Sequence, residues 1–231
     1  MRYIIETPIF AVLISLLAYE LGILINKKTK IPLFNPLMIA IATVMLVLVI
    51  LKIPLEKYQS GGNLISFFLT PATVILAVPL YKNIAALKKD WVAIISGVLV
   101  GSVTAIASVY LLGRAFLLSP ELLASLIPKS ITTPFGIELS QQIGGIPSVT
   151  VAAIIITGIT GAVFAPIVLK IFKIRDATSQ GIAIGTSAHA LGTTKAVELG
   201  ETQGAMSGLA IGLTGIATVI IATILFELGV I

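Results

Sequence analysis

The first group of residues that could do chemistry lies in one apolar run, residues 125–138. Lys129 and Glu138 are charged side chains inside this run. A charge near the middle of a bilayer costs about 2.5–3.5 kcal/mol, so it persists where it is paired or lines a wet cavity. A helix interrupted by proline also exposes backbone N–H groups that bind anions. The run therefore predicts a site for a small carboxylate, with further contacts from Ser130, Thr132, Thr133 and Pro134. The alternative is that Lys129 reaches the membrane interface and Glu138 caps a loop.

The second group surrounds the single histidine of the chain, His189. Its ordinary pKa, about 6.5, makes histidine the side chain that exchanges a proton most easily near neutral pH. Small and hydroxyl residues surround it, including Gly192 and Thr193, and Lys195 is close in sequence. Proton coupling or substrate contact is one interpretation. The other is a histidine that bonds a backbone carbonyl inside a helix bundle.

The third group belongs to the run 67–82. Pro71 and Pro79 stand eight residues apart, which is about two helical turns. The prolines predict a kinked or broken helix. Thr70 and Thr73 could then satisfy freed carbonyl groups or face a ligand. A kinked helix that serves only packing remains the alternative.

The elements that must position these residues are membrane helices. Of the 231 residues, 57% are hydrophobic and 11% are charged, against about 45–50% and 25% in soluble domains. The composition predicts an all-α integral membrane protein, with a single transmembrane domain over residues 1–231. We expect about six to eight transmembrane segments, some of them broken or re-entrant. The chain has no cysteine, which excludes disulfides and thiolate sites, and no pattern suggests nucleic acid.

Lysine and arginine cluster at residues 27–30, 82–89 and 170–175. The positive-inside rule places these loops in the cytoplasm, as in a multi-pass protein of the inner (plasma) membrane. The parity of the crossings works if the runs 122–145 and 177–198 do not cross fully; a full crossing by both would change the middle of the scheme but not its final parity. The crossings expected on this scheme are 8–26, 33–51, 62–82, 91–115, 148–169 and 205–228.

A Thr-Pro pair recurs every 63 residues, at Thr7-Pro8, Thr70-Pro71 and Thr133-Pro134. Broken helices in corresponding parts of a chain indicate the binding site of a secondary transporter. Coincidence is the alternative, because the chain is rich in threonine and proline. Near the C-terminus, glycines at four-residue spacing predict a close packing face, within the chain or in a homo-oligomer. These glycines are Gly204, Gly208 and Gly212.

Several long runs resemble the LrgB/CidB family of membrane proteins. The resemblance is carried by LTPATVILAVPLYKN, SLIPKSITTPFGIELSQQIGGIPSVT, ITGITGAVFAPIV and IAIGTSAHALGTTKAVELGETQGAMSGLAIGL. It extends from TPIF near the start to the last apolar run. The family motif positions are Thr70, Pro71, Pro79, Pro128, Lys129, Ser130, Thr133, Pro134, Gly144, Gly145, Pro147, His189, Gly192 and Thr193. Thr70 departs from an expected glycine, and Thr194-Lys195 from Ala-Arg, which loses the two-pronged contact that arginine makes with a carboxylate.

The resemblance implies two kinds of function. The family is named for antiholin-like control of murein hydrolase activity and cell lysis, with a small holin-like membrane partner of the LrgA/CidA type. Its plant relatives move glycolate and glycerate, and bacterial members are associated with pyruvate movement. We expect a secondary transporter of small monocarboxylates such as glycolate, lactate, glycerate or pyruvate, coupled to protons through His189 and Glu138. The alternative is an antiholin-like regulator of lysis.

An enzymatic function is not expected. A metal site needs several histidine or carboxylate ligands, and the chain has one histidine. Ser207 and His189 could imitate a serine–histidine pair, but no nucleophile motif supports it. The sequence indicates no cofactor.

Overall fold

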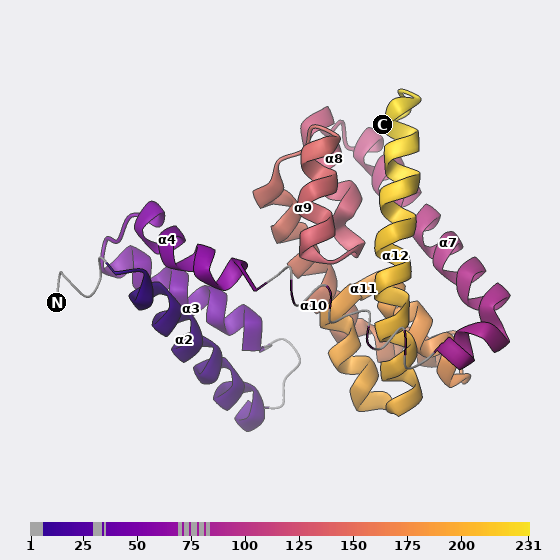
Figure 1. Cartoon of the computed structure of the whole chain (residues 1–231), viewed down its shortest axis with the longest axis horizontal. Coiled ribbons are helices and arrows are strands. Elements are labelled where there is room, and N and C mark those ends of the chain that lie inside the picture. The colour runs from indigo at the N-terminus through magenta and orange to yellow at the C-terminus, as the bar shows by residue number, and fades with distance from the viewer. Residues whose placement is uncertain are drawn as a thin grey trace. The chain divides into compact units, whose positions relative to one another are not determined.

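The structure, a computed structural model, describes residues 7–29, 34, 36–68, 71, 74, 78, 81 and 84–231. The chain divides into two compact units, Met1–Thr73 and Val74–Ile231 (Figure 1). The described residues form helices joined by short turns, and no strand occurs among them. This confirms the prediction of an all-α fold.

The first unit contains three described helices, α2 (Pro8–Thr29), α3 (Pro36–Ile50) and α4 (Leu55–Ser66). α2 packs against both α3 and α4. The Ser15 and Tyr58 hydroxyls bond across the α2–α4 contact at 2.8 Å. α2 has 22 residues and is about 33 Å long, which is enough to cross the roughly 30 Å hydrocarbon core.

The second unit combines long apolar helices with short ones. Three of its helices are long and apolar enough to cross a membrane, namely α7 from Asp90 onward, α10 and α12. Between them lie pieces that are short or broken. The elements in chain order are α7 (Ile84–Ala115), α8 (Pro120–Leu126), a 3-10 turn η1 (Ile127–Ser130), α9 (Thr133–Gln142), α10 (Pro147–Ile171), α11 (Ala177–Leu199) and α12 (Glu201–Glu227).

The segment from 120 to 146 is a re-entrant hairpin, which we call the first hairpin. α8 has 7 residues and α9 has 10, about 10 and 15 Å, so neither can cross the bilayer. The amide of Ile146 donates to Ser125 Oγ at 2.7 Å. Gly145 packs on the backbone of Ala124 and Ser125. The chain therefore returns to the level at which it entered.

A buried hydroxyl network holds the two ends of the first hairpin to the start of α10. Thr150 Oγ1 donates to the Ser125 carbonyl at 2.8 Å and lies 2.7 Å from Ser140 Oγ. Ser125 Oγ in turn donates to the Glu121 carbonyl. Thr150, Ser125 and Ser140 are fully buried. Because these groups have no access to solvent, each bond replaces one that water would otherwise make.

α11 is a second re-entrant hairpin, and its chain reverses at His189. The backbone leaves the helical region there, with φ 42 and ψ −141. On one leg, Gly181 packs against Gln203; on the other, Val197 packs against Gly204. Residues on both legs thus meet the first turn of α12, which requires a hairpin between them. We call residues 177–199 the second hairpin.

The two hairpins enter from opposite ends of α10 and meet beside Ile154. The base of the first hairpin lies at the start of α10, as the Ile146–Ser125 bond shows, and the second hairpin begins just after α10 ends. Gly136 of the first hairpin packs against the Ile154 side chain. His189 Nε2 lies 2.9 Å from the Ile154 carbonyl. Neither hairpin crosses fully, which is the first of the two alternatives that the sequence left open.

The glycines that precede the second hairpin serve this close approach. A side chain on Gly161 would collide with Ala188, and one on Gly158 would reach within 2.6 Å of the His189 ring.

An apolar cluster joins the buried residues of the first hairpin to α7 and α12. The cluster contains Ile106, Val109, Leu123, Ala124, Ile127, Ile131, Leu139, Ile143 and Ala222.

Part of the break predicted in the run 67–82 can be placed. α4 ends at Ser66, before Pro71. Pro71 is itself helical and exposed. Pro79 lies outside the described residues. The Thr-Pro pairs that can be placed, at Pro8 and Pro134, each fall in the first turn of a helix, where proline is favoured.

Replacing Thr150 with valine should destabilise the second unit by about 1–3 kcal/mol, because Ser140 and the Ser125 carbonyl lose a buried partner. Unfolding in mixed detergent micelles, followed by circular dichroism, measures the effect. Thr223→Val is the matched control, since Thr223 Oγ1 is buried without a partner among the described residues. That variant should be neutral or slightly stabilising. Equal losses in both variants would show that the network does not hold the hairpin.

Candidate functional site

A cavity of about 730 Å³ lies between α7, the η1 turn of the first hairpin and the first leg of the second hairpin. Its polar lining comes from side chains on all three elements. These are Asp90, Thr104 and Ser108 of α7, Lys129 and Ser130 of η1, and Asp176, Thr178, Ser179, Thr186 and Ser187 at and after the start of α11.

Lys129 is the cation of this cavity. It sits on η1 between the buried residues Pro128 and Ser130, and is itself partly buried. Its Nζ donates to Ser130 Oγ at 3.1 Å. No carboxylate among the described residues forms an ion pair with it. A partly buried ammonium group with one neutral partner favours an anion beside it, because a charge withdrawn from water gains most from a counter-charge.

Two carboxylates stand at the other end of the cavity. Asp176 is exposed at the start of α11 and accepts a bond from the Ser179 amide at 2.7 Å. This amide and the Ser179 hydroxyl hold the pKa of Asp176 below its usual range. Asp90 marks a kink in α7, with φ −116 and ψ 26.

The negative and positive charges of the cavity lie at opposite ends of its length along α7. From Asp90 to Ser108, its lining residues extend about 27 Å along the helix. Gly97 packs beside Ile182, and Gly101 beside Thr186, so α7 and the first leg run side by side. The exposed acidic end lies at the base of the second hairpin, and Lys129 lies at the opposite end.

Lys129 and Ser130 are the predicted site residues that line this cavity. Thr132, Thr133 and Pro134 form the start of α9, but they are not part of the lining. Thr132 Oγ1 is buried and has no partner among the described residues. Glu138 was expected inside the fold. It is exposed on α9, because the buried face of that helix is formed by Gly136, Leu139 and Ser140.

His189, Gly192 and Thr193 build the turn of the second hairpin and do not line the cavity. A carbonyl can only accept, so His189 Nε2 donates to Ile154. Thr193 Oγ1 donates to the His189 carbonyl at 2.9 Å and lies 2.7 Å from Ser207 Oγ. Gly192 packs against Ala188. The geometry matches the interpretation of His189 as a residue that bonds a backbone carbonyl.

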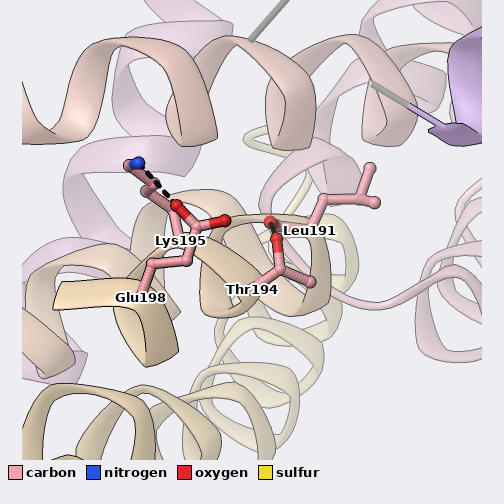
Figure 2. Close-up of polar contacts among 4 residues, drawn as sticks. All are labelled: Leu191, Thr194, Lys195 and Glu198. Atoms are coloured by element: carbon pink, nitrogen blue, oxygen red, sulfur yellow. Dashed lines mark hydrogen bonds and ion pairs between the residues drawn. The ribbon is translucent and has the colours of Figure 1, made fainter. Parts of the chain in front are cut away.

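Lys195, the other cation near His189 in sequence, already has a partner. Its Nζ lies 2.6 Å from Glu198 Oε2 on the same helical leg (Figure 2). Thr194, next to it, donates to the Leu191 carbonyl at 2.7 Å.

Thr70 and Thr73 lie outside the described residues. Of the glycines predicted to pack closely, Gly204 meets Val197, whereas Gly212 faces open space.

Sequence reasoning missed the cavity residues on α7 and on the first leg of the second hairpin. Thr186 and Ser187 stand three and two residues before His189, inside a run that the sequence had singled out. No sequence signal marks them, because only the tertiary structure shows that they precede the reversal of the second hairpin. The two legs face different neighbours, and the first leg borders the cavity.

The profile of the LrgB-like family matches residues 15–228 of the chain. The chain belongs to the LrgB family. Proteins named antiholin-like protein LrgB from Bacillus mycoides (strain KBAB4), Bacillus cereus (strain B4264) and Bacillus anthracis (strain CDC 684 / NRRL 3495) are each 37% identical to it over 216 residues. These alignments cover 93% of this chain and 94% of each relative. No solved structure matches it.

The LrgB family match includes both hairpins and the cavity. It confirms the resemblance seen in the sequence runs. Together with the four long apolar helices, it establishes that the chain is a membrane protein, whose surroundings include the lipid bilayer.

His189→Gly should be more stable than His189→Ala by about 1–3 kcal/mol, because glycine adopts positive φ without strain. Both variants lose the Ile154 bond, so their difference isolates the backbone. Thermal unfolding in detergent measures it.

Thr194 supplies the matched control for this comparison, since it lies in a regular part of the second leg. There glycine should be less stable than alanine by about 1 kcal/mol. If glycine also gives a less stable protein than alanine at position 189, the backbone does not have a positive φ there and the chain does not reverse at His189.

Proposed function

We propose that this protein is an antiholin-like regulator that restrains murein hydrolase activity and cell lysis together with a small holin-like membrane protein. The observation that carries the proposal is the likeness to proteins named antiholin-like protein LrgB over 93% of the chain. The match extends over nearly the whole length of both proteins, so it includes the membrane helices and both hairpins. An antiholin opposes a pore-forming partner within the membrane, and this chain offers long apolar helices at that depth.

The cavity favours a second candidate function, the movement of a small monocarboxylate. Lys129 provides a positive charge with no ion-pair partner among the described residues, and Ser130 adds a hydroxyl that can donate to the same carboxylate. Hydroxyls of α7 and α11 line the path to it. These donors suit a 2-hydroxy or 2-oxo acid, whose oxygen atoms all need partners once water is removed. The volume of about 730 Å³ accommodates such an acid together with water.

The arrangement of the hairpins supports the same candidate. Secondary transporters place their substrates near the middle of the membrane, where discontinuous helices from opposite sides meet. Here the two hairpins start from opposite ends of α10 and meet at Ile154. The η1 turn that carries Lys129 contacts both α10 and the second hairpin. A carboxylate bound there would lie between α7 and the two hairpins. Coupling of transport to proton movement is part of this second candidate function and not of the first.

The antiholin-like role predicts a delay in lysis. Expression of the full chain in a bacterial host that lacks its own LrgB-like protein should slow lysis and lower extracellular murein hydrolase activity. Zymography and culture turbidity measure the two effects. The delay should require the small holin-like partner, and an unchanged lysis rate with the partner present would refute the role.

Transport predicts saturable uptake by the purified chain alone. Proteoliposomes should accumulate labelled glycolate, lactate, glycerate or pyruvate, and Lys129→Gln should lower uptake at least tenfold, because a charged hydrogen bond of about 1.5–3 kcal/mol is lost. Lys195→Gln is the matched control, since Lys195 pairs with Glu198 away from the cavity. Its uptake should stay within twofold of the unsubstituted protein.

Lys129→Gln also separates the two candidates from each other. If the chain regulates lysis without moving a solute, the variant retains the delay in lysis. If regulation acts through transport, the variant loses both. Absence of uptake for all four acids would refute transport. If the lysis delay persisted, only the antiholin-like role would be supported.

A further inference from the structure

A second cavity, of about 300 Å³, lies at the turn between α10 and α11. Three of its lining residues are cations, Lys170, Lys173 and Arg175. Its remaining walls are mostly apolar, with one amide side chain. They are Pro166, Leu169, Ile174, Gln180 and Leu199.

The positive charge of this cavity is not balanced by its own walls. Among the described residues that line it, none is an aspartate or a glutamate. The nearest carboxylate in sequence, Asp176, lines the other cavity, where it accepts a bond from the Ser179 amide. None of the three cations forms an ion pair with a described carboxylate. The end of α10 contributes carbonyl groups that favour cations, but this accounts for Lys170 alone, because only Lys170 lies in the last turn of α10.

The cavity is built before any ligand arrives. Gln180 Nε2 donates to the Ile174 carbonyl at 2.7 Å, which fixes the turn against the start of α11. Its Oε1 accepts from Gln203 Nε2 at 3.1 Å, which ties the same point to α12. Leu169 is buried, and Ile174 and Gln180 are partly buried. Three helices therefore hold the position of the turn that carries Lys173 and Arg175.

The depth of the cavity in the membrane follows from the length of α10. The helix has 25 residues, about 37 Å, and the hydrocarbon core is about 30 Å thick. The last turn of α10 and the cations after it therefore reach the level of the lipid phosphates. Cationic pockets between transmembrane helices at this level bind the head groups of anionic lipids.

We propose that this second cavity binds the phosphate head group of an anionic phospholipid. Lys170, Lys173 and Arg175 contact the phosphate oxygens, and the arginine can make two parallel hydrogen bonds to them. Pro166, Leu169, Ile174 and Leu199 give the cavity apolar walls, which suit the glycerol and upper acyl carbons of a lipid. A free phosphate ion has no carbon atoms to contact these apolar walls, so the walls favour binding of the lipid over binding of the ion.

Native mass spectrometry of the full chain, released from micelles with mixed phospholipids, tests the proposal. We expect retained cardiolipin or phosphatidylglycerol and no retained phosphatidylcholine. Each cation near the surface contributes about fivefold to binding an anionic lipid. Lys170→Gln combined with Lys173→Gln should therefore lower the preference for anionic lipid more than tenfold.

The control is Lys27→Gln combined with Lys28→Gln, which removes two exposed lysines from the last turn of α2. These residues do not line the second cavity, so retention should change by less than twofold. Equal losses in the two double variants would mean that only general surface charge attracts the lipid, and would overturn the site.

A second measurement separates the lipid from the free ion. Inorganic phosphate at millimolar concentration should neither bind to the protein in neutral detergent nor displace retained lipid. Phosphate binding that depends on Lys170 and Lys173, without lipid retention, would overturn the lipid assignment. Neither outcome bears on lysis control or on carboxylate uptake, which depend on other parts of the protein.

Discussion

A broken helix inside a bilayer must find new partners for the backbone groups that it frees, and this requirement governs the second unit. Water cannot serve at that depth, so side chains and neighbouring helices must. Thr150 of α10 and Ser125 hold the two ends of the first hairpin. At the reversal of the second hairpin, Thr193 bonds the His189 carbonyl, while the His189 ring reaches α10. α10 is the common support of both hairpins.

This requirement separates residues that hold the fold from residues that remain available to a ligand. His189 and Thr193 carry polar groups, yet these groups are occupied by the reversal of the second hairpin. Lys129 differs, because its ammonium group borders a cavity and has one neutral partner among the described residues. The cavity lies where η1, at the end of the first leg of its hairpin, borders α7 and α11. The hairpin fold thus places the Lys129 charge beside an open space.

The two candidate functions depend on different parts of the protein. Lysis control through a membrane partner depends on surfaces that face the bilayer, where apolar side chains of α2, α7 and α10 are exposed. Movement of a small acid depends on the interior, on Lys129 and the hydroxyls around it. The proposed lipid site lies at a third place, at the end of α10.

The sequence by itself determined that this chain lies in a membrane, where its helices break, and that Lys129 is out of place in lipid. Those conclusions follow from composition and from proline and glycine, whose effects are local. Only the tertiary structure decided that residues 120–146 and 177–199 turn back, because the deciding contacts, Ile146 with Ser125 and Val197 with Gly204, join distant residues. It also decided that Glu138 faces outward and that Thr186 and Ser187 border the cavity. The direction in which a polar side chain points depends on which leg of a hairpin carries it, and no local pattern encodes that.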